Sequence, residues 1–105
     1  MNIKPMKMIY RKNPDVVYRV IAGEAILIPI SRETQGAGRM LTLNETGSFI
    51  WERLDGKRRL GEILEEIRDE FEVEEETARR DLLELVSSLE EAGAVLPAPG
   101  QGSRR

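Results

Sequence analysis

Short runs of β-branched and aromatic residues, separated by turn residues, occupy the first half of the chain and predict β-strands. Residues 16–21 form the first run, and their side chains suit a pleated, half-buried surface. Gly23 then marks a tight turn, and residues 25–30 follow as a second strand with three isoleucines on one face. A short third strand is predicted over residues 39–43. Three consecutive strands in this order predict an antiparallel meander.

A helical period replaces the strand pattern from Asn44 onward. Asn44 is a typical N-cap residue, and the apolar positions after it predict a helix that ends at residues 55–56. A second helix is predicted over residues 60–71, where apolar side chains recur at spacings of three and four. The third helix begins at three consecutive glutamates, residues 74–76, and ends just before Gly93.

The chain has 105 residues, which predicts one small domain. Residues 1–15 mix basic, apolar and turn residues and are interpreted as a flexible N-terminal arm, whose methionines and Tyr10 are candidates for docking on the domain or for forming a homodimer. The domain itself is placed at residues 16–96, with 94–96 as a last extended segment. The Pro/Gly-rich tail, residues 97–105, is expected to be disordered.

Two rows of side chains run along the predicted third helix. The first row could satisfy a core contact by itself, and it consists of Ala78, Leu82, Leu85, Leu89 and Ala92. The second row lies beside it and consists of Arg79, Leu83, Val86 and Glu90. Either two elements flank the helix and both rows are core, or the second row lines a groove; the pattern alone favours the core. An edge strand beside such a groove would accept an extended peptide, because its N–H and C=O groups are unpaired.

Composition excludes most catalytic chemistry. The chain has no histidine and no cysteine, so it lacks the ligands of a common zinc site and the parts of a Cys-His or Ser-His-Asp system. Its carboxylates lie in runs on predicted helix faces rather than opposed across a cleft. Gly36 and Gly38 match neither a Walker loop nor a Rossmann fingerprint. We therefore expect a binding domain that is not an enzyme and that holds no cofactor and no metal.

Charge and hydropathy narrow the classes of partner. The lack of cysteine excludes disulfides and fits a reducing cytoplasm. The longest apolar run, residues 25–30, is far too short to span a bilayer, so no membrane partner is expected. Strands followed by two closely spaced helices also outline a winged helix-turn-helix, which leaves a DNA-binding or protein-docking adaptor as the alternative. Residues 74–92 hold seven acidic residues and two arginines, however, and this helix would be repelled by phosphates.

The stretch LTLNETGSFIWERLDG, residues 41–56, resembles the PqqD-like family, which was first named for pyrroloquinoline quinone biosynthesis. The resemblance continues through the helix 60–71, the joint 72–73 and the closing LEEAG motif at 89–93, and covers about residues 15–96. It implies an α+β, winged-helix-like fold in which a three-stranded antiparallel sheet is followed by three α-helices.

The resemblance also implies a function: recognition of the leader of a ribosomally made precursor peptide. The leader would add as a strand to the third strand, in the cleft beside the third helix, and a radical S-adenosylmethionine enzyme or another modifying enzyme would be the partner. Carried over by position, the strand ladder consists of Arg39, Met40, Leu41, Thr42 and Leu43. The helix wall consists of Arg79, Leu83, Val86 and Glu90. The groove interpretation of the second row is thereby favoured.

One segment departs from the quinone-biosynthesis members of this family. Those members have a Tyr-Pro-Glu-like segment before the third strand, whereas Ile28-Pro29-Ile30 is followed here by an eight-residue connection, residues 31–38. A peptide product other than the quinone is therefore an equally good expectation.

Overall fold

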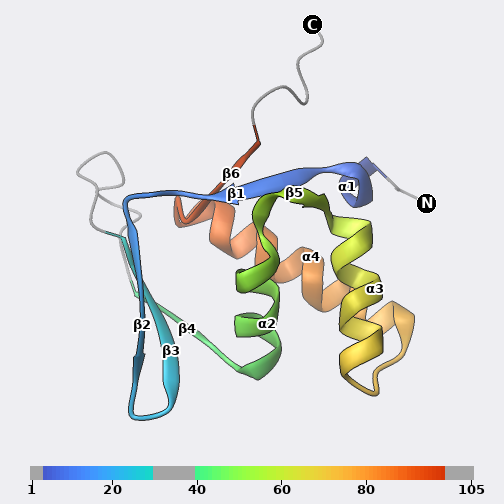
Figure 1. The fold of residues 1–105 in the computed structure, drawn as a ribbon, viewed down its shortest axis with the longest axis horizontal. Coiled ribbons are helices and arrows are strands. Elements are labelled where there is room, and N and C mark those ends of the chain that lie inside the picture. Colours follow the sequence, from blue (N-terminus) through green and yellow to red (C-terminus); the bar gives the residue numbers. More distant parts are fainter. Residues whose placement is uncertain (1–3, 30–39, 99–105) are drawn as a thin grey trace, which may run out of the picture.

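The computed structural model describes residues 4–29 and 40–98, which form two small antiparallel sheets and a group of packed helices (Figure 1). The elements follow one another as α1 (Lys4–Lys7), β1 (Ile9–Lys12), β2 (Val16–Ile21), β3 (Glu24–Pro29), β4 (Leu41–Leu43), α2 (Glu45–Arg53), β5 (Asp55–Arg59), α3 (Leu60–Glu70), α4 (Glu75–Glu91) and β6 (Val95–Pro97). The predicted α+β class, with a three-stranded antiparallel sheet followed by three helices in a winged-helix-like arrangement, is confirmed.

The first sheet has the strand order β2–β3–β4 and is the predicted meander. Strands β2 and β3 form a regular hairpin in which Ile21 lies opposite Glu24. The two loop residues, Ala22 and Gly23, have φ values of 54° and 83°, as a hairpin turn of the type I′ class requires at both positions. Strand β4 then pairs with β3 on the other side, with Leu43 opposite Ala25.

Alternate side chains of β3 point to opposite faces of the sheet, and these two faces differ in how deeply they are buried. Ala25 and Leu27 are buried in the core, whereas Ile26 and Ile28 are only half-buried on the opposite face. Ile30, the third isoleucine predicted to share that face, lies outside the described residues. The small side chain of Ala25 is buried in the core and lies opposite Leu43 of the neighbouring strand β4.

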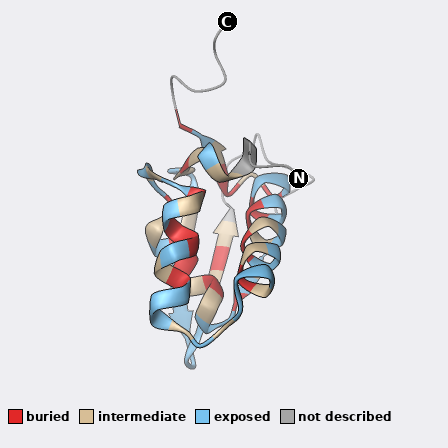
Figure 2. Ribbon diagram, turned by 90° about the vertical axis from the view of Figure 1, so that its right-hand side faces the viewer, coloured by how far each residue is buried: buried red, intermediate tan, exposed pale blue. Residues whose placement is uncertain are grey.

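The helices begin and end close to the predicted positions. Asn44 caps α2, as expected from its residue type, and Gly93 follows α4 with a φ of 77°. The predicted stripe on α3 is buried, through Leu60, Ile63, Leu64 and Ile67. Figure 2 shows that the buried positions of the helices gather on their inward-facing sides.

The second sheet has the strand order β5–β1–β6 and was not predicted. Its central strand, β1, lies within the stretch 1–15 that was expected to be a flexible arm, and Tyr10 of β1 is buried in the core. Residue Pro97, expected in the disordered tail, ends β6, which pairs with β1. Strand β5 has the sequence DGKRR, so no apolar alternation could reveal it, and without β5 nothing in the sequence marks β1 as a central strand.

Within the described part of the chain, no helix is long and apolar enough to cross a membrane.

Candidate functional site

Strand β4 lies at one edge of the first sheet, with β3 as its neighbour on the other side. Leu43 is buried and Leu41 half-buried, while Thr42 between them is exposed. Met40, just before the strand, is 62% exposed although it is a large apolar residue. Arg39, the first residue of the predicted ladder, lies outside the described residues. Among residues 4–29 and 40–98, β4 pairs only with β3, so its other edge is free of strand partners there.

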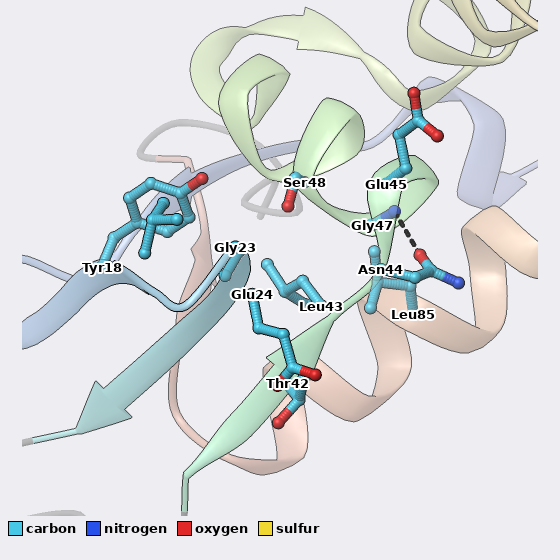
Figure 3. Close-up of a pocket in the computed structure, with 12 residues that line it drawn as sticks. Tyr18, Gly23, Glu24, Thr42, Leu43, Asn44, Glu45, Gly47, Ser48 and Leu85 are labelled. Atoms are coloured by element: carbon cyan, nitrogen blue, oxygen red, sulfur yellow. Dashed lines mark hydrogen bonds between the residues drawn. The ribbon is translucent and has the colours of Figure 1, made fainter.

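A hollow of about 790 Å³ lies beside the end of β4 (Figure 3). It is bounded by the β2–β3 hairpin, by β4, by the first turn of α2 and by one residue of α4. Its lining consists of Tyr18, Val20, Gly23, Glu24, Ala25, Thr42, Leu43, Asn44, Glu45, Gly47, Ser48 and Leu85. Because Tyr18 and Val20 are 37% and 61% exposed, this hollow presents apolar surface to solvent.

A second hollow, of about 370 Å³, lies between α2 and α4. Its lining consists of Asn44, Thr46, Gly47, Ile50, Asp81, Glu84, Leu85 and Ser88. The two hollows adjoin, since Asn44, Gly47 and Leu85 line both. We refer to them together as the β4 hollow.

The first turn of α2 is held against β4 by a local hydrogen bond. The Asn44 side-chain oxygen accepts from the Gly47 N–H at 2.7 Å, which satisfies one of the free donors at the helix start (Figure 3). A Cβ atom on Gly47 would lie 3.2 Å from that oxygen and 3.4 Å from Leu43 Cβ. The absence of a side chain at position 47 thus lets the helix start approach the strand closely.

Helix α4 contributes none of the residues predicted as the helix wall to the β4 hollow; its contribution is Asp81, Glu84, Leu85 and Ser88. Val86 is 3% exposed and belongs to the core. Arg79 and Leu83 line a separate hollow of about 370 Å³ whose other lining residues, Glu76, Arg80 and Glu84, are also on α4. The structure therefore does not bring Arg79 and Leu83 together with β4.

Glu90, the last residue of the predicted wall, lies near β1 rather than β4. Its carboxylate accepts a hydrogen bond of 3.4 Å from the Tyr10 hydroxyl. Burial raises the pKa of Tyr10, and the negative charge of Glu90 and this hydrogen bond raise it further. Glu90 thus stands at the junction of α4 with the second sheet.

Leu85 was missed because the apolar residues of α4 fit two stripes equally well. Leu85 was assigned to the core row and Val86 to the groove row, and the structure exchanges these two. The polar neighbours of Leu85 on the same helix face, Asp81 and Ser88, were the available signal. They place Leu85 at the boundary of the apolar stripe, where a side chain remains partly accessible.

Trp51 does not line the β4 hollow itself but packs against Tyr18, which does. It is buried, as predicted, and stacks on Tyr18 with a centroid distance of 6.3 Å. The Lys12 ammonium lies 5.3 Å from the Trp51 ring centroid and donates to the Leu54 carbonyl at 3.3 Å. Burial lowers the pKa of Lys12, against the opposing effect of Asp55 and Glu52. This stack links β1 to the strand that carries Tyr18.

Among residues 4–29 and 40–98, no group of three or more acidic side chains is placed to hold a metal ion. What the arrangement offers is backbone hydrogen-bonding groups along β4 and apolar surface in the adjoining hollow. A segment of extended peptide can use both at once, since alternate side chains of a strand point to the same side.

The fold and the site together define a small winged-helix-like domain with a free strand edge beside a helix. The model of the family of coenzyme PQQ synthesis protein D (PqqD) matches residues 24–95. The chain belongs to this family.

Two solved structures are similar to the chain over most of its length. One is TbiB1 in complex with the TbiA(beta) leader peptide, with 26% identity, a TM-score of 0.67, and coverage of 89% of this chain and 99% of that one. The other is lasso peptide synthetase B1 complexed with the leader peptide, with 30% identity, a TM-score of 0.68, and coverage of 84% and 98%. No sequence among curated proteins matches this chain.

Proposed function

We propose that this protein binds the leader of a ribosomally made precursor peptide and presents it to a modifying enzyme, without catalysing a reaction itself. The observation that carries the proposal is the free edge of β4 beside a hollow with apolar lining. The family supports it, and so do two structural relatives that were solved with a leader peptide bound.

The leader would pair with the backbone of β4, so that Met40, Leu41, Thr42 and Leu43 form the ladder together with Arg39. A ladder of this length fixes the direction and register of the peptide but supplies few hydrogen bonds, because β4 has three residues. Most of the affinity would then come from apolar side chains of the leader. Burial of one side chain the size of leucine contributes roughly 1.5–3 kcal/mol.

The helix wall of this site would be the face of α4 that carries Leu85. This residue is half-buried and lines both parts of the β4 hollow. Leu83, which the sequence suggested for this role, lines a different hollow formed by α4 residues. The two leucines therefore form a matched pair, one on each flank of the same helix.

The second partner would be the modifying enzyme, of the radical S-adenosylmethionine type or another type, acting in the cytoplasm where the precursor is made. The family is named for coenzyme PQQ synthesis, whereas one structural relative is lasso peptide synthetase B1. The proposal covers both kinds of product. Because residues 4–12 contribute α1 and β1 to the fold itself, it includes no homodimer formed through an N-terminal arm.

The test begins with a selection of peptides from a displayed library of random sequences of about 15 residues on the immobilised protein. A selected peptide is then titrated into the isotope-labelled protein and followed by NMR. We expect amide shifts in residues 40–43 together with Leu85 and Ser88 on α4. Shifts confined to Arg79, Leu83 and Glu90, or to β1, would contradict the β4 site, and a library that yields no binding peptide would contradict the function.

A further inference from the structure

The β4 hollow is lined by acidic residues and by no basic residue of the described chain. Glu24 and Glu45 line its larger part, and Asp81 and Glu84 line the part between α2 and α4. The separate hollow on the other flank of α4 differs, because Arg79 and Arg80 balance Glu76 and Glu84 there. The negative charge is therefore a property of the β4 side of the molecule.

The ion pairs of the described residues all lie outside the β4 hollow. Glu66 accepts from Arg53 at 2.7 Å and from Arg58 at 2.9 Å. Glu75 pairs with Arg79 at 2.6 Å. By contrast, none of the four acidic residues of the β4 hollow forms an ion pair within residues 4–29 and 40–98.

For two of these four carboxylates the structure offers a local reason for the negative charge, and for the other two it does not. Glu45 lies in the first turn of α2, where a negative charge interacts favourably with the helix dipole. Glu84 also borders the hollow that contains Arg80. Asp81 and Glu24 have neither a helix start nor an arginine beside them in the same hollow. Acidic residues left unpaired around a site gain free energy when a cationic ligand occupies it.

We infer that the leader recognised at this site carries lysine or arginine next to the apolar residue that enters the β4 hollow. The inference rests on the proposed function and names the substrate class of the same site. Apolar side chains of the peptide would contact Leu43 and Leu85, while its cationic side chains would lie against Asp81 and Glu84 and against Glu24. An acidic leader would be repelled by the same carboxylates, so charge selects among peptides that all fit the strand edge.

The experiment repeats the selection of random peptides on three forms of the full chain. These are the natural protein, the double variant Asp81→Asn/Glu84→Gln, and the control Glu65→Gln/Asp69→Asn. The control removes two exposed charges from α3, and neither of its residues lines any of these hollows. For the natural protein and the control, we expect lysine and arginine to exceed acidic residues about twofold or more in the selected peptides. For Asp81→Asn/Glu84→Gln we expect this excess to fall to near parity.

The affinity of one selected basic peptide gives a second readout. Neutralising both carboxylates should weaken its binding roughly two- to tenfold at low salt, as expected for two exposed ion pairs, and the difference should shrink at high salt. Selected peptides that shift residues 40–43 by NMR but show no excess of basic residues would overturn this inference and leave the proposed function intact. Peptides that bind without shifting residues 40–43 would instead contradict the β4 site, and a library that yields no binding peptide would contradict the proposed function.

Discussion

The two sheets of this protein have the same number of strands but differ in how far their apolar side chains are exposed to solvent. In β5–β1–β6 the central strand comes from the N-terminal segment, and its Tyr10 is 8% exposed. In β2–β3–β4 the aromatic residue is Tyr18 on the edge strand β2, and it is 37% exposed. Val20 and Ile21 of the same strand are more exposed still. Apolar surface that costs free energy in the unbound protein is thus concentrated in one sheet. This contrast suggests that the second sheet stabilises the fold, while the first leaves a surface for a partner.

The two tyrosines of the chain offer the strongest test of this contrast, because each lies in one sheet. We expect Tyr10→Ala to lower the free energy of unfolding by about 3 kcal/mol, since it leaves a cavity among core residues. Tyr18→Ala should cost about 1 kcal/mol, mainly from the lost stacking on Trp51. Urea unfolding followed by circular dichroism measures both. Equal losses would show that the two sheets contribute alike to the stability of the fold.

The strands and helices that could be predicted are those whose side chains repeat with a period. The β2–β3–β4 meander, the cap at Asn44 and the stripe on α3 all follow from local pattern and local chemistry. The second sheet could not be predicted, because β5 is polar and charged throughout and β1 is recognisable only from its two neighbours. Its pairing of residues 9–12 with 95–97 joins distant parts of the chain, which no local pattern encodes.

The candidate site was predictable in part for the same reason. The edge strand follows from the order of the strands, which the pattern contains. The helix wall depends on the rotation of α4 about its axis, and a stripe through Val86 fits the sequence as well as one through Leu85. Packing against the other helices decides between them by burying Val86 to 3% exposure.

The two flanks of α4 give the second test. Leu85→Glu should weaken the binding of a selected peptide more than tenfold, because it removes apolar contact in the β4 hollow and adds a charge there. Leu83→Glu is the matched control, since Leu83 is also half-buried on the same helix, and we expect a change within about twofold. Fluorescence anisotropy of a labelled peptide measures both. A larger loss for Leu83→Glu would restore the helix wall that the sequence first suggested.

The junction between β4 and α2 gives a smaller effect on stability. Asn44→Ala removes the acceptor for the Gly47 N–H and should lower the free energy of unfolding by about 1 kcal/mol. Asn44→Ser keeps a side-chain acceptor and should recover most of this loss. If thermal unfolding shows the two variants to be equally destabilised, the hydrogen bond at this position contributes little and packing of Gly47 alone holds the junction.

The smallest expected change in the free energy of unfolding comes from removing a single carboxylate, and it differs between a carboxylate with an ion pair and one without. Burial would raise the pKa of Asp55, but the hydrogen bonds from the backbone N–H groups of Lys57 and Arg58, together with the Arg58 guanidinium, hold it below its ordinary value of 3.8. A carboxyl group whose pKa is lowered by folding contributes stability above its unfolded-state pKa, and this contribution is lost as the pH falls through the folded-state pKa. Asp55→Asn should therefore cost about 0.5 kcal/mol at neutral pH. The difference should shrink below the ordinary pKa of 3.8 and vanish once the pH has fallen through the lower folded-state pKa.

Asp81→Asn is the control for this comparison, because Asp81 has no ion pair within the described residues. Urea unfolding at neutral and acidic pH should show no loss of stability for it, although it should weaken the binding of a basic peptide. A pH-dependent loss for Asp81→Asn equal to that of Asp55→Asn would mean that the carboxylates of the β4 hollow stabilise the fold. In that case these carboxylates would not be available to bind a cationic ligand.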